Sequence, residues 1–140
     1  MPNAVPEETR EACVSIESVN DIVAARRQGR ILAERLGFSP SEATLVATAI
    51  SELARNIVAY AQRGEVVIRA TSQAGRHGVM IIARDQGPGI SDVKLALQQG
   101  YSTSGGLGLG LPGVRRIMDV FMVDSGPDRG TSITATKWKI

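Results

Sequence analysis

A glycine-rich stretch in the second half of the chain has the composition of an anion-binding loop. Residues 105–111 read Gly-Gly-Leu-Gly-Leu-Gly-Leu, and residues 114–121 follow with apolar side chains at helical spacing. A glycine loop that leads into a helix presents unpaired backbone N–H groups and the positive end of the helix dipole to a ligand. The stretch therefore predicts a phosphate cradle, with a flexible glycine hinge as the alternative.

Neither of the two common phosphate-binding signatures fits this loop. No Gly-Lys-Ser/Thr follows the glycines, which excludes the P-loop pattern. Ser102-Thr-Ser104 precedes them in place of an apolar strand, which excludes the dinucleotide-binding fingerprint. A different nucleotide fold is needed to position the glycines.

A carboxylate and an amide lie four residues apart in the segment 39–61. The segment begins with Ser39-Pro-Ser-Glu42, a helix start with a serine cap, and its apolar residues then recur at steps of three and four. Glu52 and Asn56 share a helix face that adjoins this apolar stripe. Polar groups at the edge of a core-facing stripe are poorly placed for solvation alone, so both are candidate site residues.

A third polar group, Asp85, directly follows the apolar strand expected over 79–84. The sequence Asp85-Gln-Gly-Pro-Gly89 indicates a tight turn that can approach a ligand, with an ordinary Asp-led turn as the alternative. Gly130-Thr131 opens the last alternating segment of the chain.

The elements that must position these groups are predicted from periodicity and turn residues. Strands are expected over 13–18, 66–72, 79–84, 120–124 and 131–138, and helices over 20–36, 39–61, 112–119 and, as a short one, 91–99. This order favours an α+β fold: a two-layer α/β sandwich with a mixed, mostly antiparallel sheet covered on one face by three helices. Residues 1–11 are expected to be an N-terminal arm, and residues 12–140 a single domain.

The composition excludes several classes of protein. The net charge of +2 comes from 16 basic and 14 acidic residues, and aromatic residues are 4% of the chain, so a nucleic-acid partner is not expected. A single cysteine, Cys13, excludes an internal disulfide and is expected to be a small buried apolar residue. No apolar run indicates a signal peptide or a membrane span, so we expect a cytoplasmic protein without a membrane contact.

Taken together, the polar segments resemble the GHKL ATPase superfamily, which has the Bergerat nucleotide-binding fold. Glu52-Leu-Ala-Arg-Asn56 resembles the N box of the superfamily, and Asp85–Gly89 and Gly106–Gly110 resemble its two glycine boxes. Gly130-Thr131 resembles its last conserved pair, so the match spans about residues 12–138. We expect neither a phospho-acceptor histidine helix nor a second domain, and the chain resembles most the small RsbT-type serine/threonine kinases of partner-switching pathways.

This resemblance implies a role for each motif residue, with ATP and Mg²⁺ as cofactors. Glu52 would be the catalytic base, Asn56 would bind Mg²⁺, and Asp85 would accept a hydrogen bond from the adenine amino group with support from Thr131. A contribution of Arg55 to charge neutralisation is a further hypothesis. The remaining residues expected to contact the nucleotide, or to form a lid over it, are Gly87, Gly89, Ser102, Thr103, Ser104, Gly105, Gly106, Leu107, Gly108, Leu109 and Gly110.

The resemblance also implies protein partners. The substrate would be a serine or threonine of a STAS-domain protein within the stress-signalling complex called the stressosome, and the released kinase would activate a downstream phosphatase by binding it. Three alternatives stay open: an anti-sigma factor serine kinase that sequesters a sigma factor, a nucleotide-gated binding module with little catalysis, and a water-directed ATPase. A homodimer is also left open.

Overall fold

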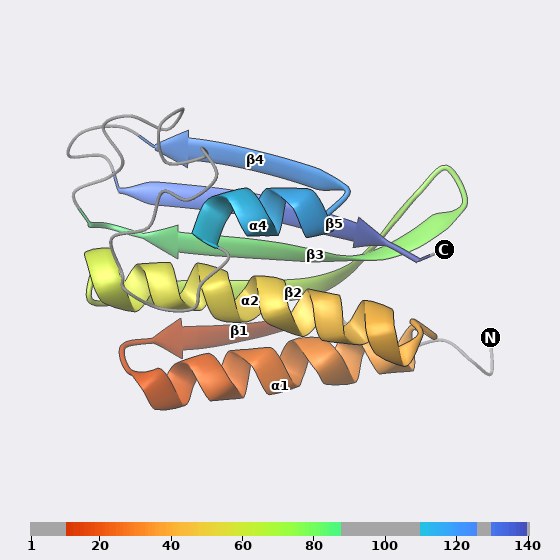
Figure 1. Cartoon of the computed structure of the whole chain (residues 1–140), viewed down its shortest axis with the longest axis horizontal. Helices are drawn as coiled ribbons and strands as arrows, with labels where there is room; N and C mark the ends of the chain where they lie inside the picture. Colours follow the sequence, from red (N-terminus) through yellow and green to blue (C-terminus); the bar gives the residue numbers. More distant parts are fainter. Residues whose placement is uncertain (1–10, 88–109, 126–129, 140) are drawn as a thin grey trace.

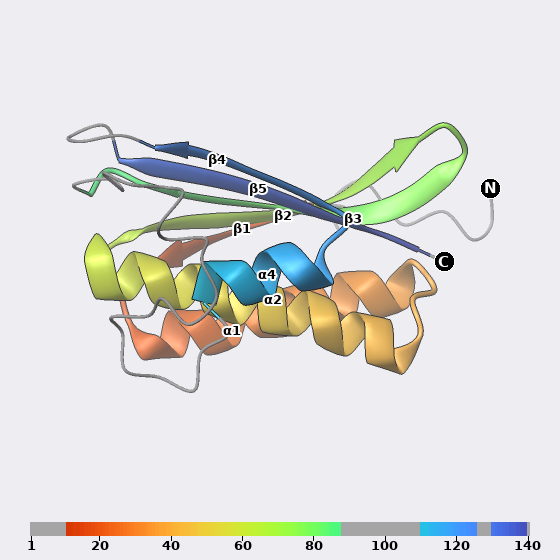
Figure 2. The same ribbon diagram turned by 45° about the horizontal axis from the view of Figure 1, so that its top comes forward.

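The computed structural model describes residues 11–87, 110–125 and 130–139. Within these ranges, five strands form one sheet and three helices cover one of its faces (Figures 1 and 2). The α+β sandwich expected from the sequence is confirmed. The strands are β1 (Glu11–Ile16), β2 (Gly64–Gln73), β3 (Arg76–Asp85), β4 (Val120–Ser125) and β5 (Thr131–Trp138), and the helices are α1 (Val19–Arg35), α2 (Pro40–Tyr60) and α4 (Gly110–Ile117).

The strand order in the sheet is β1-β2-β3-β5-β4, and all four pairings are antiparallel. The described sheet is therefore antiparallel throughout, where the sequence predicted a mixed, mostly antiparallel one. The chain does cross over from β3 through α4 to β4, so these two strands point the same way (Figure 1). They do not pair, because β5 lies between them and is antiparallel to both.

The start of α2 follows from its capping residues. The Ser39 hydroxyl accepts from the Glu42 N–H at 3.2 Å, and the Glu42 carboxylate accepts from the Ser39 N–H at 3.2 Å, with Pro40 in the first turn. This reciprocal capping satisfies backbone donors that a helix start leaves unpaired. The same helix then packs closely on α1 at Gly29, where any Cβ would collide with the side chain of Ile50.

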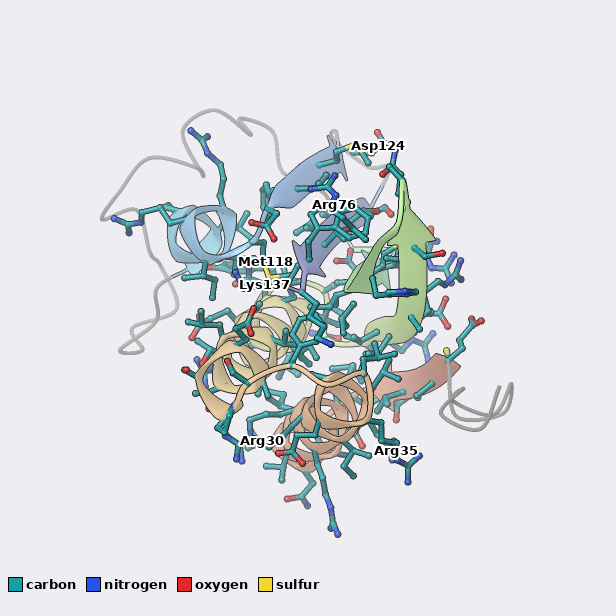
Figure 3. All side chains as sticks on the ribbon, turned by 90° about the vertical axis from the view of Figure 1, so that its right-hand side faces the viewer. Arg30, Arg35, Arg76, Met118, Asp124 and Lys137 are labelled. Carbon is teal, nitrogen blue, oxygen red and sulfur yellow. The ribbon has the colours of Figure 1, made fainter. Side chains whose placement is uncertain are left out.

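The core lies between the helix layer and the sheet. Apolar side chains of α2 face the helix-covered side of the central strands. The largest fully buried side chains in this layer include Val46, Ile50, Leu53, Val66, Ile68, Val79 and Ile81. The end-on view of Figure 3 shows Met118 between α4 and α2, and Arg30 and Arg35 on opposite flanks of α1. Burial of one aliphatic side chain contributes about 1.5–3 kcal/mol, so this layer fixes α2 against the sheet.

The β2–β3 hairpin is tighter than expected. Gln73 pairs with Arg76, so only Ala74 and Gly75 form the turn, and both have positive φ (53° and 80°). This is the conformation of a two-residue turn that matches the twist of its strands. The strands expected over 66–72 and 79–84 leave residues 73–78 as the connection, whereas the structure places His77 in β3 with an exposed side chain.

The expectation of a buried Cys13 is wrong. Cys13 is exposed on β1, because the strand alternates and the side chains of Val14 and Ile16 take the core-facing positions. Its thiol donates to a Glu65 carboxylate oxygen at 3.2 Å. This hydrogen bond, together with burial, raises the pKa of the Cys13 thiol. The short helix expected over 91–99 lies outside the described residues.

No helix in the described ranges combines the length and the apolar character that a membrane crossing requires.

Candidate functional site

A row of small and polar residues crosses the sheet at one end. Gly64 pairs with Asp85, Asp85 with Thr131, and Thr131 with Ser125. We call these four residues the site row. Within each strand, these residues lie an even number of positions from residues that face the helices. The site row is therefore on the helix-covered face of the sheet, the same face as the core. The next row inward is apolar: Val66, Ala83, Ile133 and Val123.

The backbones of β2 and β5 pass close to the end of β3. A Cβ at Gly64 would collide with the carbonyl oxygen of Arg84, and a Cβ at Gly130 would collide with that of Asp85. Gly130 also has a φ of +74°, which side chains rarely tolerate. The half-buried Asp85 carboxylate is held in turn by the Gly87 N–H, which donates to it at 2.9 Å.

The C-terminal half of α2 lies against the site row. A Cβ built on Gly64 would lie 3.0 Å from Ile57 Cγ2, and one built on Gly87 would lie 2.6 Å from the Cβ of Ala61. Half-buried Asn56 directly precedes Ile57 on this helix. Asn56 and Asp85 therefore lie at the same end of the molecule, where α2 and β3 both terminate (Figure 1, left).

Glu52, one turn before Asn56, links α2 to the start of α4. It is 8% exposed, and one carboxylate oxygen, Oε1, lies 2.7 Å from Nη1 of Arg55. The other oxygen, Oε2, accepts from the Gly110 N–H at 3.4 Å. A buried carboxylate is costly unless it is paired, so these two donors stabilise Glu52 in place.

The start of α4 presents a positive helix end to this region. Gly110 is the first residue of α4 and has a φ of +61°, and the next residues, Leu111 to Val114, are buried and hold the helix start. Its N–H points to a carboxylate, as expected where the helix dipole and unpaired N–H groups favour an anion. The same group could instead serve a phosphate.

Thr131 belongs to a hydroxyl pair that the sequence did not reveal. Its Oγ1 lies 2.8 Å from Oγ of Ser125, and the Ser125 hydroxyl donates to the carbonyl of Gly130 at 3.0 Å. Ser125 is thus an additional site residue. Only the register of the β4–β5 pair places it beside Thr131, and spacing along the chain does not encode that register.

The described candidate residues therefore lie on elements that converge at one end of the sheet: Glu52, Asn56, Asp85, Gly87, Gly110 and Thr131. The other candidates lie outside the described residues: Gly89, Ser102, Thr103, Ser104, Gly105, Gly106, Leu107, Gly108 and Leu109. Arg55, for which the sequence suggested a contribution to charge neutralisation, contacts the carboxylate of Glu52.

The donor set suits a particular kind of metal ion. In the described part of the chain, no group of three or more His, Cys, Asp or Glu side chains could hold a metal by itself. Asn56 provides one amide oxygen beside Glu52. One protein oxygen fits Mg²⁺, which keeps several waters and is commonly completed by substrate phosphates, and does not fit a structural zinc site.

A separate groove of about 130 Å³ lies between α1 and strands β1 and β2. Gln28, Ile31 and Arg35 of α1 contribute to its lining, and none of the candidate residues does.

A model of the histidine kinase-like ATPase domain matches residues 17–137. The chain belongs to this family. The match includes every candidate residue, and it confirms the recognition made from the boxes in the sequence. An ATPase and kinase domain of this family uses ATP.

Two relatives indicate which reaction the chain catalyses. The chain is 51% identical over 128 residues to the serine/threonine-protein kinase RsbT of Bacillus subtilis, an alignment that covers 91% of this chain and 96% of the relative. It is 33% identical over 103 residues to the anti-sigma F factor of the same organism, covering 69% of each chain. The expected activity is therefore confirmed: the chain is a serine/threonine-protein kinase.

A solved structure shares the fold. The SiaB-SiaC complex from Pseudomonas aeruginosa contains a chain that superposes with a TM-score of 0.56 at 17% identity, covering 94% of this chain and 92% of that one. At this identity the similarity concerns the fold alone.

Proposed function

We propose that this kinase binds Mg-ATP at the end of the sheet marked by the site row and phosphorylates a serine or threonine of a STAS-domain partner. One observation carries the proposal. Glu52 and Asn56 project from the half of α2 that packs beside Asp85, and Glu52 also contacts the first N–H of α4. A carboxylate, an amide oxygen and a helix N-terminus are the groups that phosphoryl transfer requires near one another.

The nucleotide would lie across the site row. Asp85 accepts a hydrogen bond from the adenine amino group, which selects adenine over guanine, because guanine carries a carbonyl oxygen at that ring position. Thr131, held by Ser125, supports this contact. The lack of side chains at Gly87 and Gly130 lets the backbone pass close to Ala61 and to the end of β3, beside the proposed position of the base. The start of α4, where the Gly110 N–H holds Glu52, offers the positive end of its helix dipole to the phosphates.

Asn56 would hold Mg²⁺ together with phosphate oxygens and waters. The bound ion would neutralise negative charge on the phosphates. The other candidate loop residues, Gly89 and residues 102–109, remain proposed nucleotide contacts.

Glu52 is the proposed general base. It accepts the proton of the substrate hydroxyl as the hydroxyl oxygen bonds to the γ-phosphorus. The bond from that phosphorus to the bridging oxygen breaks, and ADP leaves with that oxygen. A positioned base of this kind contributes about 100- to 10,000-fold to the rate. Burial of Glu52 between α2 and α4 fixes its direction.

The proposed partners follow from the similarity to RsbT across nearly the whole chain. They are a STAS-domain substrate within a stressosome scaffold and a downstream phosphatase that the released kinase activates by binding, all in the cytoplasm. The second candidate is an anti-sigma factor kinase that sequesters a sigma factor, because several anti-sigma F factors are more than 30% identical to this chain.

Phosphotransfer to purified STAS-domain proteins tests the proposal. Labelled ATP should transfer its γ-phosphate to one of them, and Glu52→Gln should reduce the rate by about 100-fold or more. The matched control Glu34→Gln, an exposed carboxylate on α1, should transfer normally.

Three results would contradict the leading choice. A folded, ATP-binding protein with no transfer would favour a binding module. Phosphate release without any protein acceptor would favour an ATPase. Stable retention of a sigma factor in a pull-down, with no STAS-domain protein retained, would favour the anti-sigma kinase.

A further inference from the structure

The Glu52–Arg55 ion pair has no assigned part in the proposed reaction. Arg55 Nη1 lies 2.7 Å from Glu52 Oε1, and the Gly110 N–H donates to Glu52 Oε2 at 3.4 Å. Both donors, a guanidinium and the first N–H of a helix, also suit phosphate oxygens. A carboxylate oxygen engaged by a guanidinium is a poorer acceptor for a substrate proton than a free one.

The two members of the pair differ in burial, and the difference indicates which one moves. The side chain of Glu52 is 10% exposed, whereas that of Arg55 is 42% exposed. The Arg55 guanidinium reaches solvent, so Arg55 is the member that can move to another anion, while the buried Glu52 stays between α2 and α4.

We propose that Arg55 exchanges partners during the reaction, from the carboxylate of Glu52 to the γ-phosphate of ATP. A phosphate carries more charge than a carboxylate and can bind the guanidinium through two oxygens, whereas Glu52 offers Arg55 only Oε1 because its Oε2 accepts from Gly110, so bound ATP competes for Arg55. The exchange frees Oε1 of Glu52 to accept the hydroxyl proton. It also places a cation on the phosphoryl group where negative charge must be stabilised.

The exchange rests on the proposed role of Glu52 as the base, and it makes Arg55 a sensor of the third phosphate. ADP lacks the γ-phosphate, so with ADP bound Arg55 remains on Glu52. The protein should therefore use Arg55 to distinguish ATP from ADP, a property that a merely structural ion pair would not give.

Nucleotide affinities measured by calorimetry with Mg²⁺ test this exchange. In Arg55→Ala, the affinity for the non-hydrolysable ATP analogue AMP-PNP should fall about tenfold while that for ADP stays nearly unchanged. The kcat for phosphotransfer should fall about 100-fold with little change in the KM for the protein substrate. Arg55→Lys should recover part of both losses.

Arg27→Ala removes the same charge from an exposed position on α1 and should change neither affinity. Equal weakening of AMP-PNP and ADP by Arg55→Ala, or no weakening of either, would overturn the exchange.

A second variant separates this inference from the base role. Glu52→Gln removes the charge that retains Arg55, so AMP-PNP should bind about threefold more tightly, and the gain should vanish in the double variant Glu52→Gln/Arg55→Ala. Unchanged or weaker binding in Glu52→Gln would overturn the exchange. Retained phosphotransfer in Glu52→Gln would instead disprove the role of Glu52 as the base. In that case the AMP-PNP and ADP affinities of Arg55→Ala alone would show whether Arg55 binds the γ-phosphate.

Discussion

The two ends of strand β3 are built differently. At the Arg76 end, side chains cover one another: the guanidinium carbon of Arg76 lies 4.6 Å from the centre of the Trp138 ring. A Cβ on Gly78 would collide with the carbonyl oxygen of Lys137 and would lie 2.8 Å from the same ring. The backbone N–H of Trp138 donates to Asp119 at 2.7 Å. Stacking and hydrogen bonding complete this end within the chain itself.

At the Asp85 end, close backbone contacts replace side-chain cover. Gly64, Gly87 and Gly130 each lie where a Cβ would press on the neighbouring chain, and Asp85 and Thr131 are half-buried beside them. Side-chain stacking stabilises a sheet, whereas half-buried polar groups without such cover can bind a ligand. The difference indicates that the Asp85 end is specified for binding and the Arg76 end for stability.

Alanine at Gly130 should give the largest effect. It places a Cβ at positive φ against the carbonyl of Asp85, and we expect a loss of about 3 kcal/mol in the free energy of unfolding. Gly75→Ala is the matched control at the hairpin tip, where φ is +80° and no atom lies within 4 Å, so only about 1 kcal/mol should be lost. Urea unfolding measures both, and equal losses would contradict the account of the Asp85 end.

Removal of the Trp138 ring should affect stability alone. Trp138→Ala exposes Gly78 and ends the contact with Arg76, and we expect a loss of about 2 kcal/mol in unfolding free energy with unchanged AMP-PNP affinity. Thermal unfolding with calorimetry measures both quantities. A loss of nucleotide affinity in a folded variant would show that the two ends are not separate in function.

Asp85→Asn should have the opposite effect to Trp138→Ala: nucleotide affinity should fall, while stability should hardly change. Asn has one acceptor oxygen, which is weaker than a carboxylate oxygen and is also needed by the Gly87 N–H, so ATP affinity should fall about tenfold or more with little change in stability. Asp119→Asn makes the same change at the opposite end and should leave affinity unaltered. Unchanged affinity in Asp85→Asn would disprove its adenine role.

The smallest effect concerns Glu65, which lies near the Asp85 end and pairs with Arg84 and Cys13. Glu65 raises the pKa of the Cys13 thiol above its ordinary value of 9.0, so the folded state favours the neutral thiol. This contact stabilises the fold below the ordinary pKa and is lost as pH rises through the raised one.

Glu65→Gln should therefore lower the pKa of Cys13 and speed its alkylation by iodoacetamide at mildly alkaline pH. The pH profile of the alkylation rate measures the change, and an identical midpoint in both proteins would rule out the Glu65 contact. Nucleotide affinity should not respond, because Glu65 points to the open face of the sheet, opposite the site row.

Much of the fold could be predicted because its signals are local. The Ser39–Glu42 cap sets the start of α2, and alternation of apolar and polar residues marks β1 and β5. The same alternation puts Cys13 in phase with Ser15 on the outer face, and in this strand it overrides the general tendency of cysteine to be buried. The positions of Ala74 and His77 depended on where the strand pairing ends, which composition does not determine.

The candidate site was predictable as a set of residue types and less so as a set of contacts. Glu52 and Asn56 share a face by helical spacing, but the approach of Gly110 to Glu52 depends on how α4 packs against α2. The Ser125–Thr131 pair depends on strand register, which spacing along the chain does not encode. The Glu52–Arg55 pair, in contrast, joins residues three apart on one helix, so helical spacing already allows it.

The central claim is that groups from α2, β3, α4 and β5 bind one adenine nucleotide. Mapping of amide chemical shifts by NMR, during titration with Mg²⁺ and AMP-PNP, tests it most directly. We predict large shifts at Asn56, Gly87, Gly110 and Thr131 and small ones at Gly75 and Trp138. Shifts confined to the hairpin end, or to Gln28 and Ile31 in the groove beside α1, would contradict the claim.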